Sequence, residues 1–261
     1  MTKTFDASMP SASRIYDYLL GGTDNYECDR QAGEAFVTAL PNARNSARAT
    51  RGFALRAARY LAEQGFDQIL DVGAGIPTTP NVHQIVHEVR PGARVVYVDN
   101  DPVAIAKGQA LRDEDGVITV EGDLRAPASF LNNPGVRDMI DFSRPVGVLT
   151  VAVWHFVGDE HLAPAPAELR AALAPGSYLA LSHACTENLT PAQIRAGEAL
   201  YKRTTNPVKA RSREQIEALL DGFALVEPGL VPLHEWRPRD GDPYPEESPE
   251  AFAGVGILRS P

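Results

Sequence analysis

Short apolar runs alternate with segments of helical periodicity along the chain from residue 66 onward. We expect buried strands over residues 68–72, 94–101, 118–124, 146–157 and 177–184. Helices are expected between them, over residues 80–90, 102–114 and 159–174. Strands that alternate with helices predict right-handed crossovers and a mostly parallel sheet with both faces covered, an α/β fold of the Rossmann-like type.

The two ends of the chain carry different patterns. Helices are expected before the first strand over residues 11–20, 28–40 and 44–64, and glycines at 21 and 22 would end the first of them. After the fifth strand we expect helices over 190–203 and 212–221, then strands over 223–231 and 254–259 joined as an antiparallel hairpin at the sheet edge. The pattern divides the chain into an N-terminal helical extension, residues 1–65, and one compact α/β unit, residues 66–261.

An arginine stripe runs along the third expected helix, on a face separate from its apolar residues. The stripe consists of Arg44, Arg48, Arg51 and Arg59. We interpret it as a solvated helix face. An anion-binding role is the weaker alternative.

Composition narrows the classes of partner and of environment. The chain has 261 residues and a net charge of −9, so bulk electrostatics do not favour a nucleic-acid partner. No apolar run reaches membrane-spanning length, and the first residues lack a secretory signal pattern. With only two cysteines, a reducing cytoplasm is expected instead of a disulfide scaffold. The oligomeric state does not follow from these features.

Three acidic residues stand at the ends of three successive expected strands. Asp71 precedes Gly73 and Gly75, whose G-x-G spacing suits a tight loop that brings the backbone close to a ligand. Asp99 ends the next strand, where an acid can accept both hydrogen bonds of a ribose diol. Asp123 ends the third strand and is placed to accept from an adenine amino group. The alternative is that these acids merely cap helices and turns.

Two nucleotide cofactors are compatible with this set of residues. A dinucleotide site favours a third glycine in G-x-G-x-x-G, but Pro77 and Thr78 stand in this part of the chain. S-adenosylmethionine (SAM) has an ammonium and a carboxylate in place of a pyrophosphate, and Asp71 can face the ammonium. We therefore favour SAM over a nicotinamide cofactor.

A polar and aromatic segment precedes this motif, in the first helices. We expect it to cover the cofactor and one wall of an acceptor pocket, with Tyr16, Tyr18, Asn25 and Tyr26 as the covering residues. Acidic residues 17 and 29 would pair with arginines 14 and 30 and hold the shape of this cover. The alternative is a packed helix hairpin with no contact to a ligand.

Aromatic residues also end the fourth expected strand. Trp154 and His155 are placed to line the acceptor pocket, and His155 is a candidate general base near neutral pH. A core or pocket-lining histidine is the alternative. His83 and His87 are interpreted as packing residues, since H-E-x-x-H is absent, and no metal site is expected.

Six motifs in order carry a resemblance to a known family. They are PSASRIYDYLLGG, ILDVGAGIPT, ARVVYVDNDPV, GDLR, PGSYLALSHA and EPGLV. Together they resemble a bacterial family of SAM-dependent methyltransferases long catalogued as a domain of unknown function. The resemblance implies a class I methyltransferase fold, with a seven-stranded sheet, an antiparallel last strand and an N-terminal helical extension.

The resemblance also implies roles for individual residues. It places Asp71, Gly73 and Gly75 in the cofactor loop, Asp99 with Asn100 at the ribose, and Asp123 with Leu124 at the adenine. The expected function is a cytoplasmic SAM-dependent methyltransferase acting on a small-molecule acceptor. The alternatives are a nicotinamide-dependent oxidoreductase and a catalytically silent SAM-binding protein.

Overall fold

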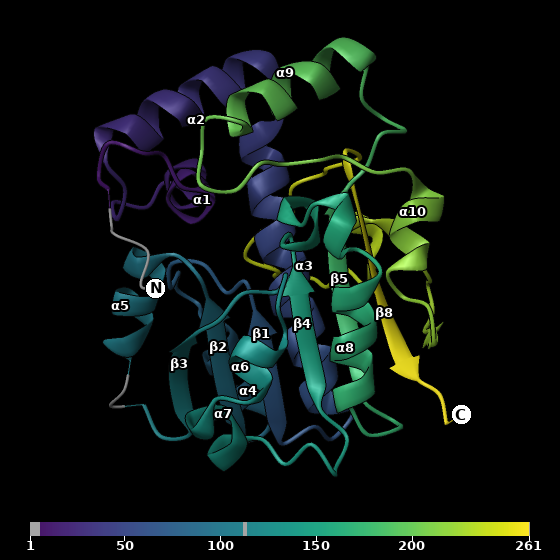
Figure 1. Ribbon diagram of the computed structural model, residues 1–261. Helices are drawn as coiled ribbons and strands as arrows, with labels where there is room; N and C mark the ends of the chain where they lie inside the picture. Colours follow the sequence, from purple (N-terminus) through teal and green to yellow (C-terminus); the bar gives the residue numbers. More distant parts are fainter. Residues whose placement is uncertain (1–5, 112–113, 261) are drawn as a thin grey trace.

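A twisted, mostly parallel sheet forms the centre of the computed structural model, which describes residues 6–111 and 114–260 (Figure 1). The strand order is β3-β2-β1-β4-β5-β8-β6, and only β8 runs antiparallel to its neighbours in this order. The strands are β1 Gln68–Val72, β2 Arg94–Asp99, β3 Val117–Glu121, β4 Gly147–Val151, β5 Tyr178–Ala184, β6 Phe223–Leu225 and β8 Ala251–Leu258. This order confirms the predicted Rossmann-like α/β fold.

Helices cover both faces of the sheet. One face packs against α3 Ala43–Glu63, α4 Val82–Val89 and α5 Pro102–Gln109. The other face packs against α6 Ala128–Leu131, α7 Pro134–Met139, α8 Pro164–Ala172 and α10 Arg213–Ala218. The apolar runs of β1, β2 and β4 are buried on both sides for this reason.

Three further helices lie beyond the carboxyl ends of the parallel strands. These are α1 Ala12–Leu20, α2 Glu27–Ala39 and α9 Pro191–Tyr201, and in Figure 1 they form a layer over that edge. Ile15 and Leu19 of α1 are buried with Tyr201 of α9 in a separate apolar cluster. The long helix α3 joins this layer to the sheet, because Phe53 and Leu61 are fully buried in the core. The division of the chain into two parts at residue 65 stays a prediction.

The predicted elements differ from the structure mainly at their ends. Strand β4 stops at Val151, and Ala152 adopts a positive φ of 54°, so the chain turns into a short 3-10 helix, η1 Trp154–Phe156. The short helices α6 and α7 and the two-residue strand β7 Val231–Pro232 have too few residues for a periodic signal. Two more 3-10 turns, η2 Asp159–His161 and η3 Leu233–Glu235, complete the elements.

The sequence predicts no apolar run of membrane-spanning length, and the structure allows this to be checked for helices. Among the described residues, the helices are all too short or too polar to span a bilayer. Among the described residues, no three His, Cys, Asp or Glu side chains come together in a group that could hold a metal ion, and the absence of a metal site stays a prediction.

Candidate functional site

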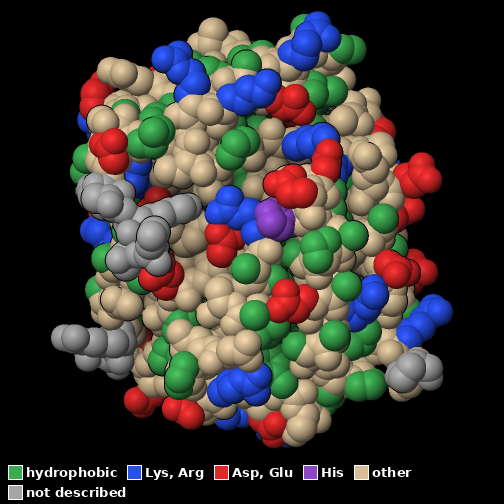
Figure 2. All heavy atoms as spheres, in the orientation of Figure 1, with side chains coloured by type: hydrophobic (Ala, Val, Ile, Leu, Met, Phe, Trp, Pro, Cys, Tyr) green, Lys and Arg blue, Asp and Glu red, His purple; other side chains and the backbone are tan. Residues whose placement is uncertain are grey.

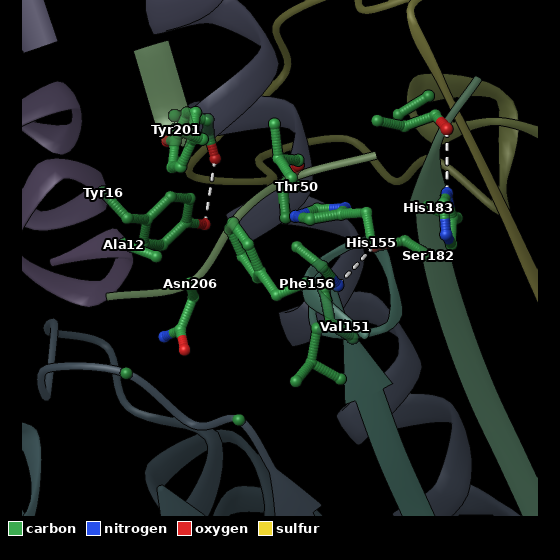
Figure 3. A pocket seen from close by; sticks show the side chains of 18 of the residues that line it. Ala12, Tyr16, Thr50, Val151, His155, Phe156, Ser182, His183, Tyr201 and Asn206 are labelled. Atoms are coloured by element: carbon green, nitrogen blue, oxygen red, sulfur yellow. Dashed lines mark hydrogen bonds between the residues drawn. The ribbon is translucent and has the colours of Figure 1, made fainter. Parts of the chain in front are cut away.

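A cavity of about 550 Å³ lies between the carboxyl edge of the sheet and the helical layer. One part, which we name the cofactor end, is lined by residues that follow β1, β2 and β3, together with Arg51 of α3. The other part, which we name the acceptor chamber, is lined by α1, α2, the first half of α3 and the turn before it, η1, the end of β5, α9 and residues 250–251. In Figure 3, Tyr16, His155, Phe156 and Tyr201 lie around this chamber.

The glycine loop after β1 needs both of its glycines. Gly73 and Gly75 have φ angles of 77° and 70°, which lie in a region that residues with a side chain rarely adopt. A Cβ on Gly73 would also lie 2.6 Å from Val153, whereas a Cβ on Gly75 would meet nothing within 4 Å. The loop is therefore closed toward the β4 turn and open at Gly75, where a ligand can approach the backbone.

The acids near the carboxyl ends of β1 and β2 lie in the cavity wall and are almost fully buried. Burial raises the pKa of Asp71 to about 7 and that of Asp99 to about 6, and the negative charge of Asp99 further raises the pKa of Asp71. Asp99 accepts hydrogen bonds from the backbone N–H groups of Gly75 and Asp101, at 2.7 and 2.8 Å. A cationic ligand, or one that carries hydroxyl groups, would stabilise the charged forms of both carboxylates.

Arg51 differs from the rest of the arginine stripe, and here the sequence interpretation is wrong. Its side chain is 8% exposed and lines the cofactor end, because its position on α3 faces the glycine loop. Nη2 donates to the carbonyl groups of Thr78 and Pro80, both at 2.6 Å, while Nε is buried with no hydrogen-bond partner among the described residues. The interpretation holds for the other three arginines, which form surface ion pairs with Glu34, Glu246 and Glu88.

The acid after β3 is held by its neighbours. Arg125 contacts both carboxylate oxygens of Asp123 through Nε and Nη2, and Asn100 donates to Oδ2 at 3.2 Å. These contacts lower the pKa of Asp123 to about 2 in spite of partial burial. Asn100, Asp123 and Leu124 all line the cofactor end, and their roles at a ribose and an adenine stay predictions.

The structure brings only one of the four covering residues to the cavity. Tyr16 lines the acceptor chamber, and its hydroxyl donates to the carbonyl of Ala47 at 3.0 Å. Tyr18, Asn25 and Tyr26 are not among the lining residues. The Tyr18 hydroxyl bonds Glu34, Asn25 bonds Asp17 and Gly22, and Tyr26 begins α2 with 39% of its surface exposed.

A buried ionic network fastens the N-terminal segment beside the cofactor end. Arg14 Nε donates to Asp29 Oδ2 at 2.9 Å, and Ser11 Oγ donates to Asp101, which also caps α5. Of the two acids expected to pair with Arg14 and Arg30, Asp29 pairs with Arg14, whereas Asp17 accepts from amide groups and Arg30 pairs with Glu27. Because Asp101 lies two residues after Asp99, the network joins the helical layer to the part of the cavity wall formed by Asp99.

The turn after β4 separates two neighbouring aromatic residues. Trp154 is fully buried in the core and does not line the cavity, whereas His155 does. The prediction that Trp154 lines the acceptor pocket therefore finds no support in the geometry, because the positive φ at Ala152 turns its side chain to the core. His155 Nδ1 is buried without a hydrogen-bond partner among the described residues, and burial lowers the pKa of His155 well below its usual value.

A second histidine and an arginine support that turn. Arg211, which is fully buried, donates to the carbonyl groups of Trp154 and Val157 at 3.2 and 2.8 Å, on either side of His155. His183 has Nδ1 beside the carbonyl of Ala184 and Nε2 beside Arg211, so it is a neutral imidazole with its proton on Nδ1. His183 therefore has no free lone pair for proton transfer, and His155 is the imidazole that remains available.

The cofactor end fits SAM on the chemistry of its residues. A buried pair of carboxylates suits a cation and a ribose diol, the open backbone at Gly75 admits a ligand, and the unpartnered Nε of Arg51 suits a carboxylate. No signal in the sequence separated Arg51 from Arg44 or Arg48, because all three lie on the same expected helix.

Comparisons with known proteins agree with this assignment. The family model described as S-adenosyl methyltransferase matches residues 1–259. None of the curated proteins compared with the chain matches it.

Two solved structures resemble the chain over nearly its whole length. A candidate methyltransferase from Thermobifida fusca YX is 38% identical, with a TM-score of 0.90 over 98% of this chain and 97% of that one. A DUF574 family protein from Streptomyces avermitilis MA-4680 is 37% identical, with a TM-score of 0.87 over 97% of this chain and 98% of that one. Human N-acetylserotonin methyltransferase, solved with SAM, is 13% identical and shares the fold, with a TM-score of 0.50 over 88% of this chain and 57% of that one.

Proposed function

The chain belongs to the S-adenosyl methyltransferase family and is a SAM-dependent methyltransferase, and from this premise we propose that it methylates a small molecule held in the acceptor chamber. Family membership removes the nicotinamide-dependent oxidoreductase from consideration. The shape of the cavity supports a small molecule as the acceptor.

The observation that carries the proposal is the helical layer over the cavity. Helices α1, α2 and α9 lie across the carboxyl edge of the sheet, and all three contribute residues to the lining of the same cavity. A volume of about 550 Å³ is of the size that holds small ligands, and here cofactor and acceptor share it. A folded macromolecule would need an open approach to the methyl group, which this layer restricts.

Surface charge supports the same conclusion. On the face shown in Figure 2, acidic and basic side chains are interspersed and form no continuous basic surface. Together with a net charge of −9, this gives little attraction for a nucleic acid.

We assign the residues of the cofactor end by chemistry. Asp99 would accept from the ribose hydroxyls, Asp71 would face the ammonium group, and Arg51 would bind the carboxylate through its free Nε. Asp123 and Leu124 would border the adenine ring. Bound SAM supplies a methyl group already activated by its sulfonium centre.

The remaining contribution of the chain is orientation and the handling of one proton. The chamber walls hold the acceptor atom close to the methyl group and exclude water, which is the main requirement of an in-line transfer. A hydroxyl acceptor must also lose its proton, whereas a neutral amine attacks through its lone pair and loses a proton afterwards. His155, kept neutral by burial, is the group that would accept this proton.

The proposal is tested by locating transferred label. The full-length protein is incubated with methyl-labelled SAM and a bacterial extract divided by size into small molecules and macromolecules. Label is expected in the small-molecule fraction and should be lost with an Asp99→Ala variant. Label confined to the macromolecular fraction would overturn the proposal, and SAM binding without transfer to either fraction would indicate a catalytically silent protein.

A further inference from the structure

The acceptor chamber contains a carboxylate that forms no ion pair with a cation of the part of the chain that the structure describes. Glu250, the residue before β8, is half-buried and lines the chamber beside Ala251. Within residues 6–111 and 114–260, no lysine, arginine or histidine forms an ion pair with it, although fifteen ion pairs of lysine or arginine with other acids are found there. An unbalanced charge in a cavity wall is costly unless other groups stabilise it.

Neutral groups hold this carboxylate in place. Asn42 Nδ2 donates to Oε1 and Oε2 of Glu250, at 2.9 and 3.0 Å. Ser46 and Ser248 donate to Oε2 through their hydroxyl groups, at 3.2 and 3.1 Å. Three side chains from two distant segments thus fix the orientation of one carboxylate.

The position of Glu250 explains how the charge is tolerated. Asn42 precedes α3 and Ser46 lies in its first turns, so the carboxylate sits at the N-terminus of a 21-residue helix. The backbone dipoles of such a helix give its N-terminus a partial positive charge, which stabilises an anion there. The helix thus supplies a partial positive charge to Glu250, and among residues 6–111 and 114–260 no side chain of full opposite charge pairs with it.

The rest of the chamber favours a cation as that partner. The lining of the whole cavity includes two arginines among the described residues, Arg51 and Arg125, and both belong to the cofactor end. The chamber presents instead the acidic side chain of Glu198 on α9 and the rings of Tyr16, Phe36, Phe156 and Tyr201. Aromatic rings attract cations through their faces and disfavour an unpaired anion.

We propose that the acceptor is a cationic amine with an apolar or aromatic body, and that Glu250 binds its ammonium group. This inference rests on the proposed small-molecule function and specifies the class of acceptor. An acceptor with a carboxylate or phosphate would meet Glu250 with no compensating cation in the chamber, so acids of the same shape are excluded.

The test uses matched compounds that differ only in charge. Tryptamine, tryptophol and indole-3-acetate form one set, and phenethylamine, 2-phenylethanol and phenylacetate form a second. Each is titrated into the full-length protein saturated with S-adenosylhomocysteine, which fills the cofactor end. In each set the amine is expected to bind at least about tenfold more tightly than the alcohol, and the acid more weakly than either, as a charge-assisted hydrogen bond requires.

Variants of Glu250 distinguish its recognition of the ammonium group from its support of the fold. Glu250→Gln should remove the preference for the amine and leave SAM affinity unchanged, while Glu250→Asp, which keeps the charge, should retain part of the preference. Glu247→Gln, at an exposed position in the same loop, is the matched control and should behave as wild type.

The possible failures are distinguishable. Equal binding of amine, alcohol and acid to a protein that still binds SAM would overturn the role of Glu250 and leave the small-molecule function intact. A Glu250→Gln variant that loses thermal stability but keeps its amine preference would show that Glu250 only fastens the start of α3. Binding of SAM but of neither compound set would overturn this inference, whereas the small-molecule proposal would be overturned only by label confined to the macromolecular fraction.

Discussion

The backbone N–H of Gly75 donates to Asp99 Oδ2 at 2.7 Å, which joins the glycine loop after β1 to the acid that ends β2. The loop and the acid are 24 positions apart in the chain and form one unit in the cavity wall. Removing the acid should therefore affect both the ribose contact and the shape of the loop.

We expect Asp99→Ala to bind SAM at least about tenfold more weakly than wild type, because each charge-assisted hydrogen bond contributes about 1.5–3 kcal/mol. Calorimetric titration measures this. Asp67→Ala, which removes an exposed acid paired with Arg144 at the opposite end of β1, serves as the control. A folded Asp99→Ala variant with wild-type affinity would remove Asp99 from the cofactor site.

SAM affinity should decline as the pH falls from about 8 to about 5. In the free protein the pKa of Asp71 is about 7 and that of Asp99 about 6, because burial disfavours their charged forms. A cationic ligand interacts with the charged forms, so its binding lowers both pKa values and releases protons. Affinity is thus complete above the higher free-state pKa and is lost as the pH drops through both values.

Calorimetry in buffers of different ionisation enthalpy measures the released protons directly. The Asp99→Asn variant should lose the part of the pH dependence near its own pKa. Proton uptake on binding, or an affinity that is constant over this range, would contradict the assignment of the two buried acids.

Arg51→Met should weaken SAM binding by about tenfold or more, since it removes the charged partner proposed for the ligand carboxylate. Arg48→Met is the matched control, because Arg48 lies three positions earlier in α3 and is 45% exposed, in a surface ion pair with Glu246. Surface pairs contribute about 0–1 kcal/mol, so this variant should bind SAM normally and unfold at a nearly unchanged temperature. Equal effects of the two substitutions would show that Arg51 has no special place in the site.

Arg14→Met should reduce the free energy of unfolding by about 3 kcal/mol, because it leaves Asp29 buried without its charged partner. Urea titration measures this loss. Arg30→Met, which removes an exposed ion pair with Glu27, should cost about 1 kcal/mol or less. Similar stabilities of the two variants would argue against the buried network as the fastening of the helical layer.

His155→Ala should lower kcat by about a hundredfold and leave SAM affinity nearly unchanged, if the acceptor loses its proton to this residue. Because burial lowers the pKa of His155 well below its usual value, the imidazole is neutral at neutral pH. The rate should therefore stay level through neutrality and fall only in more acidic solution, unlike the near-neutral titration that the sequence alone predicts. His161→Ala, at a partly exposed position, is the control, and a parallel loss of SAM binding would make His155 a cofactor contact instead.

The order of strands and helices and the position of the cofactor end could be read from the sequence. Both depend on short-range features: the apolar runs define the strands, and in a parallel sheet the residues after successive strands meet at one edge. Gly73 and Gly75 were predictable for the same reason, because a tight loop at that edge requires their backbone angles. The three acids and the missing third glycine favoured SAM as the cofactor, the resemblance to a family supported this choice, and the matching family model confirmed it.

The contacts between distant segments were decided by tertiary packing alone. Arg48 and Arg51 are alike in sequence, but only Arg51 faces the glycine loop, because the rotation of α3 against the sheet sets which side is buried. Asn42 meets Glu250 across 208 positions of the chain, so no local pattern marked that carboxylate. Periodicity describes one element at a time, whereas the direction of a side chain into a shared cavity depends on how several elements pack together.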